Sequence, residues 1–179
     1  MGSPKQLLRY RGQSLIRRAA QSAVESTCDR VVVVVGRDAQ QMRDELRDVA
    51  VSVTENQNWQ DGMSSSIRAG MEEIINDDID AVVLMLCDQP FVTADTLNNL
   101  VATHLETRKP IVASSYENTL GAPAFFSREL FDELTSLTAD EGARRIILRH
   151  PDSVATITFP QGAFDIDTAQ EYELLKTQI

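Results

Sequence analysis

Short apolar runs alternate with amphipathic stretches along this chain. The run at 31–35 consists entirely of valine, and the run at 81–86 is also unbroken. Runs of this kind are typical of strands buried on both faces, as in parallel sheets. Shorter segments with a strand-like composition lie at 49–53, 111–114, 123–126 and 154–159.

Between the apolar runs, hydrophobic residues recur with the spacing of a helix. Ile67, Met71 and Ile74 fall on one face of such a stretch, and Thr93 is a favourable N-cap in front of another. On this basis we expect helices at 13–26, 38–48, 64–75, 93–105, 130–137, 143–149 and 169–178.

The alternation of strands and helices predicts an α/β fold with a doubly wound, mostly parallel sheet. Helices on both faces of that sheet would make a three-layer αβα arrangement. The sequence contains no internal repeat, low-complexity tract or linker rich in Pro, Gly and Ser. A chain of 179 residues is long enough for one sizeable core. We therefore expect one domain over residues 1–179.

Composition and charge narrow the classes of ligand. The chain is 42% hydrophobic and 25% charged, with a formal net charge of −10. This balance argues against a DNA- or RNA-binding protein, which would have a basic face. A small phosphorylated ligand remains compatible, because local cations and a divalent metal hold phosphates. No apolar run approaches the length of about 18 residues needed to span a membrane, and the start has no apolar signal region. We expect a cytoplasmic protein that does not contact membranes.

Two acidic motifs next to predicted strands or helices are candidates for binding a metal ion. Asp88 comes directly after the strand-like run at 81–86, and ligands of open α/β sheets bind at the carboxyl ends of strands. A carboxylate there can hold Mg²⁺, which in turn binds nucleotide phosphates. The alternative is a turn aspartate that only caps the connection. Asp165 and Asp167 precede the last predicted helix, where they either cap it or share a metal ion with Asp88.

Three further segments have the chemistry of ligand contacts. A polar segment leads into the predicted helix at 64–75, whose N-terminus suits an anion. Gly121 marks either a turn into a strand or a close approach of the backbone to a ligand. Arg144 is either a phosphate or carboxylate contact or a surface cation. The polar segment contains Asn56, Asn58, Trp59, Gly62, Ser64, Ser65 and Ser66.

The order of these motifs resembles one family. Met-Gly-x-Pro-Lys ends at Lys5, Asn-x-Asn-Trp ends at Trp59, and Asp88-Gln89-Pro90 follows the second long apolar run. Gly121-x-Pro, Glu-Gly-Ala-Arg ending at Arg144, and Asp-Ile-Asp-Thr at 165–168 come next in the chain. In this order and spacing the chain resembles the MobA-like nucleotidyltransferases, and most closely the molybdenum cofactor cytidylyltransferases, from residue 1 to about residue 176.

The resemblance implies a reaction and a set of site residues. It implies transfer of CMP from CTP to the molybdopterin cofactor, with Mg²⁺ and release of pyrophosphate. The product serves xanthine-dehydrogenase-type molybdoenzymes, so the resemblance also implies one of these enzymes as a partner. Lys5 would contact the triphosphate, Asp88 would hold the metal, and Asp165 or Asp167 would be the second metal contact. The implied nucleotide and cofactor contacts are Asn56, Asn58, Gly62, Ser64, Ser65, Ser66, Gln89, Pro90, Gly121 and Arg144.

The N-terminus departs from the family pattern. Members begin with a strand and a glycine-rich loop just before Met-Gly-x-Pro-Lys, whereas this sequence starts at that Met. The expected sheet therefore lacks its first strand and has an unfilled slot or an exposed edge. Two explanations stand: a longer natural protein, or a short form that has lost catalysis. We favour the longer protein, because the downstream motifs are intact.

Three alternatives to cytidylyl transfer remain from the sequence. A close variant of the enzyme uses GTP. A protein of another class would bind molybdopterin cofactor without catalysis and insert it into a molybdoenzyme. A third option is the same fold acting on a different sugar or lactyl phosphate.

Overall fold

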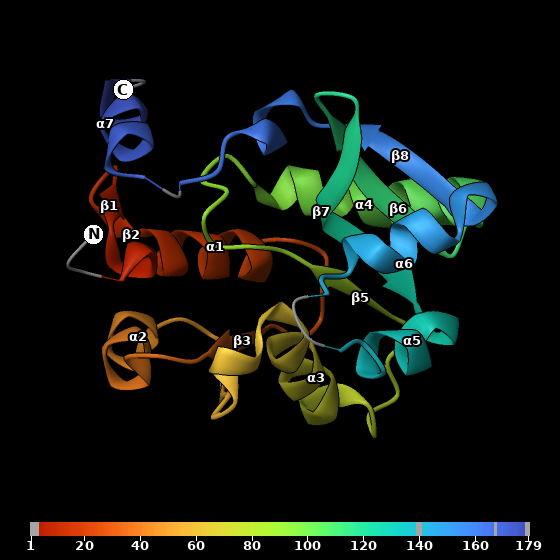
Figure 1. Cartoon of the computed structure of the whole chain (residues 1–179), viewed down its shortest axis with the longest axis horizontal. Helices are drawn as coiled ribbons and strands as arrows, with labels where there is room; N and C mark the ends of the chain where they lie inside the picture. Colours follow the sequence, from red (N-terminus) through yellow and green to blue (C-terminus); the bar gives the residue numbers. More distant parts are fainter. Residues whose placement is uncertain (1–3, 139–140, 167, 178–179) are drawn as a thin grey trace.

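The structure, a computed structural model, describes residues 4–138, 141–166 and 168–177 of the chain. Strands and helices alternate along it, as the hydrophobic pattern predicts (Figure 1). The strands are β1 (Arg9–Tyr10), β2 (Gln13–Ser14), β3 (Val32–Val35), β4 (Ser52–Glu55), β5 (Ala81–Leu84), β6 (Ile111–Tyr116), β7 (Thr119–Ser127) and β8 (Val154–Thr158).

The expected helices form with their ends shifted by a few residues. Ser14 caps the first of them by accepting a hydrogen bond from the Arg17 backbone, and Thr93 forms a capping box with Thr96. The α-helices are α1 (Leu15–Val24), α2 (Ala39–Leu46), α3 (Met63–Ile74), α4 (Ala94–Thr107), α5 (Phe131–Thr135), α6 (Arg144–Arg149) and α7 (Ala169–Thr177). Short 3₁₀ helices are η1 (Lys5–Leu7), η2 (Trp59–Asp61), η3 (Arg128–Leu130), η4 (Pro151–Ser153) and η5 (Pro160–Ala163).

The strands form a four-stranded sheet and two pairs. The large sheet has the order β5-β7-β6-β8, β3 pairs with β4, and β1 forms a short hairpin with β2. The β3–β4 and β6–β8 pairs are parallel, whereas β7 runs antiparallel to both of its neighbours. Because β7 alone reverses direction in the large sheet, β5, β6 and β8 point the same way. Their carboxyl ends therefore lie at one edge, where open α/β sheets bind ligands.

The segment around Gly121 differs from the expected turn into a strand, because it lies inside β7. Ala113 pairs with Ala124 and Ser114 pairs with Gly121, so the two residues between them oppose no partner. This irregularity accommodates Pro123, which has no backbone N–H to donate to a ladder. The Ala122–Pro123 peptide bond is cis, and the Pro123 carbonyl accepts a hydrogen bond from Ser114 Oγ at 2.7 Å.

Helices cover both faces of the large sheet, in agreement with the three-layer expectation. On one face α4 packs on β6, β7 and β8 around Leu100, Val112 and Phe125. On the other face α3, α5 and α6 share a larger core around the fully buried Phe126 and Ile146. In Figure 1, α7 lies beside the β1–β2 hairpin. The Tyr172 hydroxyl accordingly donates a hydrogen bond to the Arg9 carbonyl at 2.8 Å.

The β3–β4 pair and the large sheet pack against each other, but the described strands β3 and β5 form no backbone pairing with each other. Val32 of β3 shares a core with Val82 and Leu84 of β5, yet the two strands belong to different sheets. Among the described residues, β3 pairs only with β4 and β5 pairs only with β7. The unfilled position expected from the sequence thus corresponds to one unpaired edge on each of these strands.

Within the described part of the chain, every helix is too short or too polar to span a lipid bilayer. This agrees with the absence of a long apolar run in the sequence.

Candidate functional site

Lys5 and Asp88 meet at the carboxyl end of β5. Lys5 lies in η1, close to the start of the described chain, and Asp88 follows β5 by a few residues. The Lys5 ammonium donates a hydrogen bond to Asp88 Oδ2 at 2.6 Å, and the two side chains are 32% and 15% exposed. Two motifs separated by 83 residues in sequence therefore form one charged pair at the edge where ligands bind.

The loop after β8 brings the second acidic motif to Asp88. The backbone N–H of Ile166 donates to the Asp88 carbonyl at 3.1 Å, and the Ile166 side chain is fully buried with Tyr10 and Leu15. Asp165 directly precedes Ile166 in the chain, so this hydrogen bond brings the backbone of Asp165 close to that of Asp88. Asp167, the other predicted metal contact, lies outside the described residues.

The donor set suits a hard divalent cation. Oδ1 of Asp88 is buried, and it has no hydrogen-bond partner among the described residues. Carboxylate oxygens are the ligands that Mg²⁺ and Mn²⁺ prefer. Within the same described part of the chain, no three His, Cys, Asp or Glu side chains gather in a metal-binding arrangement. A small number of carboxylates together with substrate phosphates is the usual way in which Mg²⁺ is held.

Gln89 and Pro90 are tied to both neighbouring segments. Gln89 is 3% exposed, and its Nε2 donates to the Gly162 carbonyl in the loop after β8 at 3.1 Å. Arg18 of α1 donates through Nε to the Pro90 carbonyl at 2.8 Å. The Asp-Gln-Pro motif therefore has a defined position relative to α1 and to the loop that carries Asp165.

Tyr116, which the sequence did not single out, lies in this cluster. It is the last residue of β6, and the Gly121 and Gly162 backbones lie directly against its ring and hydroxyl. Burial raises the pKa of the Tyr116 phenol, and the charge of Asp165 and, more weakly, that of Asp88 act in the same direction. The Gln89 side chain and the Arg144 charge oppose this rise in pKa. The phenol is consequently a neutral hydrogen-bond donor at physiological pH.

The Asn56 side chain organises the turn that starts α3. Its Nδ2 donates to Ser65 Oγ at 2.7 Å and to Ser66 Oγ at 3.0 Å, and its Oδ1 accepts from the Asn58 backbone at 2.9 Å. Ser65 Oγ in turn donates to the Gly62 carbonyl at 2.7 Å. Asn56 and Ser65 are each 4% exposed. These contacts give both side chains a structural role, and direct ligand contact by this segment stays a prediction.

Gly62 and Ser64 complete this turn. Gly62 has a φ of 87°, a left-handed conformation that favours glycine, and it directly precedes α3. Ser64 is fully buried. The helix therefore begins immediately after a residue whose backbone conformation only glycine adopts easily.

Arg144 lies on the other predicted cofactor segment. As the first residue of α6, it donates through Nη2 to Thr119 Oγ1 of β7 at 2.6 Å. A methyl group on the nearby Gly142 would lie 3.0 Å from Met63 Sδ, so this segment contacts the start of α3. The segments at 56–66 and 141–144, which both carry implied nucleotide and cofactor contacts, are therefore neighbours in the structure.

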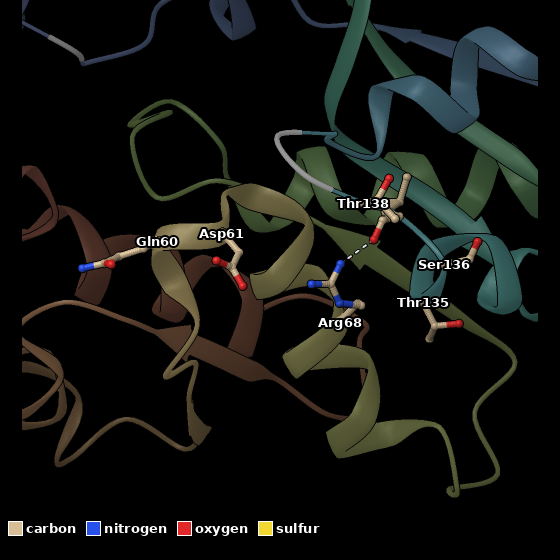
Figure 2. A pocket seen from close by; sticks show the side chains of 7 residues that line it. Gln60, Asp61, Arg68, Thr135, Ser136 and Thr138 are labelled. Atoms are coloured by element: carbon tan, nitrogen blue, oxygen red, sulfur yellow. Dashed lines mark hydrogen bonds between the residues drawn. The ribbon is translucent and has the colours of Figure 1, made fainter.

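An open hollow lies beside these two segments, between η2, α3 and the end of α5 (Figure 2). Its volume is about 650 Å³. Arg68 projects across it and donates a hydrogen bond to the Leu137 carbonyl. None of the predicted catalytic or metal-binding residues lines this hollow. The lining residues are Gln60, Asp61, Arg68, Thr135, Ser136, Leu137 and Thr138.

Cys87, next to Asp88, should resist alkylation. Burial raises the pKa of its thiol to about 12, with the Asp88 charge adding to the shift and Lys5 opposing it. At pH 8 only about 10⁻⁴ of such a thiol is the reactive thiolate. We expect iodoacetamide to modify Cys28 and leave Cys87 intact, as measured by peptide mass spectrometry. Cys28→Ser should then take up no label, and rapid labelling of Cys87 would contradict this environment.

Comparison with known proteins identifies the class that this fold and site define. The chain belongs to the MobA-like NTP transferase domain family, whose model matches residues 1–154. A crystal structure of Rv0371C from Mycobacterium tuberculosis H37Rv in complex with manganese is 28% identical. It superposes with a TM-score of 0.78 and covers 98% of this chain and 92% of its own.

Two curated relatives match over long stretches. Nicotine blue oxidoreductase of Paenarthrobacter nicotinovorans is 28% identical, across 96% of this chain and 88% of the relative. Purine catabolism protein PucB of Bacillus subtilis is 29% identical, across 67% of this chain and 58% of its own length. These findings confirm the family predicted from the motifs and leave the nucleotide and the acceptor open.

Proposed function

We propose that this protein transfers CMP from CTP to the molybdopterin cofactor and releases pyrophosphate. The observation that carries the proposal is the Lys5–Asp88 pair at the carboxyl end of β5, joined by the loop of Asp165. A cation and carboxylates at one point are what a metal-bound triphosphate requires. Membership of an NTP transferase family supports the same reading.

In the proposed reaction an oxygen of the terminal phosphate of molybdopterin forms a bond to the α-phosphorus of CTP. The bond between that phosphorus and the bridging oxygen to the β-phosphate breaks, and pyrophosphate leaves with the electron pair. Such transfers depend mainly on positioning and on neutralising charge. The Lys5 ammonium would neutralise part of the triphosphate charge, and Asp88 would keep Lys5 at the site before the nucleotide binds.

Asp88 and Asp165 are the described residues that would hold a divalent metal. When bound, such an ion lowers the repulsion between the phosphates and the attacking oxygen. The buried, unpartnered Oδ1 of Asp88 supports this assignment. The manganese complex of the mycobacterial relative supports a divalent ion, and we propose Mg²⁺ for this chain.

Two alternatives can be separated from the proposed reaction. A GTP-dependent enzyme would use the same Lys5 and Asp88 contacts. A non-catalytic carrier would bind molybdopterin through the segments at 56–66 and 141–144 and hand it to a molybdoenzyme without turning over nucleotide. The name of the Paenarthrobacter relative suggests redox chemistry, but this sequence has no GxGxxG dinucleotide motif.

The test is pyrophosphate release by the protein with molybdopterin cofactor and Mg²⁺, with CTP and GTP compared at equal concentration. We expect release with CTP, and release that is at least tenfold slower with GTP. Faster release with GTP would overturn the choice of nucleotide. Binding of molybdopterin with no release from either nucleotide would favour the carrier.

A further inference from the structure

The ring of Tyr116 is clamped between two glycines from different segments. A methyl group on Gly121 would lie 2.3 Å from the Tyr116 hydroxyl, and one on Gly162 would lie 2.6 Å from Cδ1 of the same ring. Both distances are far shorter than a normal van der Waals contact of about 3.5 Å. Gly121 belongs to β7 and Gly162 to the loop after β8. The tyrosine therefore connects the β6–β7 hairpin to that loop.

The lack of a side chain at these two positions has a steric cause. The glycines with positive φ are Gly12 and Gly62 among the described residues, so neither Gly121 nor Gly162 needs a left-handed backbone. Alanine would suit the backbone at both positions. The Tyr116 hydroxyl leaves no room for a Cβ atom at Gly121, and the rings of Tyr116 and Phe159 together leave none at Gly162.

The clamped loop carries groups of the candidate site. The Gly162 carbonyl accepts the hydrogen bond from Gln89, and Asp165 follows three residues later. The next residue, Ile166, donates its N–H to the Asp88 carbonyl. A displacement of Gly162 by the ring of Tyr116 would therefore move the partner of Gln89 and the neighbour of Asp88 together.

We propose that Tyr116 is a positioning residue, which holds the loop at 160–166 so that Asp165 stays beside Asp88. Its relevance to catalysis rests on the proposed function, whereas its structural part does not. The ring acts by filling the space between Gly121 and Gly162, and the hydroxyl lies at the narrowest contact. A tyrosine at the end of β6 would thus set the separation of the two carboxylate-bearing loops.

A pair of compensating substitutions tests this inference. Gly121→Ala should drive the hydroxyl away, because its Cβ would lie 2.3 Å from that oxygen. Adding Tyr116→Phe removes the oxygen, and the nearest remaining ring atom, Cζ, is 3.2 Å from the same Cβ. The double variant should therefore recover what Gly121→Ala loses. Tyr116→Phe alone keeps the ring and serves as the matched control.

The primary measurement is hydrogen exchange of the Ile166 amide, which reports contact of the loop with Asp88 without requiring catalysis. We expect Gly121→Ala to accelerate this exchange at least tenfold. The double variant and Tyr116→Phe should exchange within threefold of the wild-type rate. Tyr116→Ala, which removes the ring altogether, should also accelerate it. Wild-type exchange in Gly121→Ala, or no recovery in the double variant, would overturn the proposal.

Kinetics separate this inference from the proposed function. In Gly121→Ala the Mg²⁺ concentration for half-maximal pyrophosphate release, measured at saturating CTP, should rise about tenfold. The double variant should restore the metal dependence. An unchanged metal dependence with altered exchange would refute the catalytic part. If even the wild-type protein releases no pyrophosphate, the proposed function fails and the exchange cycle still decides the role of Tyr116.

Discussion

Asp88→Asn is expected to lower the rate of pyrophosphate release at least about a hundredfold, the order of effect seen when one charge-stabilising group is lost from an active site. The substitution preserves size and removes the charge that faces the Lys5 ammonium at 2.6 Å. It also weakens the oxygen donor available to a divalent ion. Initial rates with saturating CTP measure the first effect, and calorimetric titration with Mn²⁺ alone measures the second.

Asp78→Asn is the matched control for this substitution. Asp78 precedes β5, whereas Asp88 follows it, and its side chain is exposed. We expect wild-type rates and wild-type Mn²⁺ affinity from the control. Full activity in Asp88→Asn, with the melting temperature unchanged, would show that Asp88 is not part of the chemistry.

Asn56→Ala is expected to lower the free energy of unfolding by about 2 kcal/mol, because buried groups lose their hydrogen-bond partners. The amide makes contacts with Ser65, Ser66 and the Asn58 backbone, and its side chain is nearly inaccessible. Urea denaturation followed by circular dichroism measures this difference, which should appear as a lower midpoint with an unchanged slope.

The control for the amide is Asn99→Ala on the exposed side of α4. Exposed substitutions of this kind change stability by less than about 0.5 kcal/mol. Equal midpoints for Asn56→Ala and the control would mean that the turn before α3 does not depend on the amide.

Local signals explain how much of the fold the sequence predicts. The run of valines forms β3, and the Thr93 hydroxyl caps α4 as expected, because both features depend only on neighbouring residues. The direction of β7 depends on pairing with β5 and β6 instead. The sequence indicated a turn at Gly121 and Pro123, whereas both residues lie within β7. The irregular pairing that admits proline inside this strand involves Ser114 and Ala124, and only the structure shows it.

The candidate site likewise contains residues that the sequence predicts and one that only the structure reveals. Lys5, Asp88 and Asp165 could be grouped before the structure was known because their motifs occur in the order of a family. Tyr116 could not, because its role depends on two glycines that lie 41 residues apart in the chain and meet only through the fold. The two glycines are visible in the sequence, but only the structure shows that neither has a left-handed backbone and that both lie against Tyr116.

The unpaired edges of β3 and β5 have a consequence for cooperativity. No ladder of backbone hydrogen bonds joins the β3–β4 pair to the large sheet among the described residues. The two parts share a hydrophobic core instead, against which Val32 of β3 and Val82 of β5 both pack. Parts connected in this way open as separate units with different free energies. We therefore expect hydrogen exchange to show that the amides of the β3–β4 pair and those of the large sheet open locally with different free energies, both below that of global unfolding.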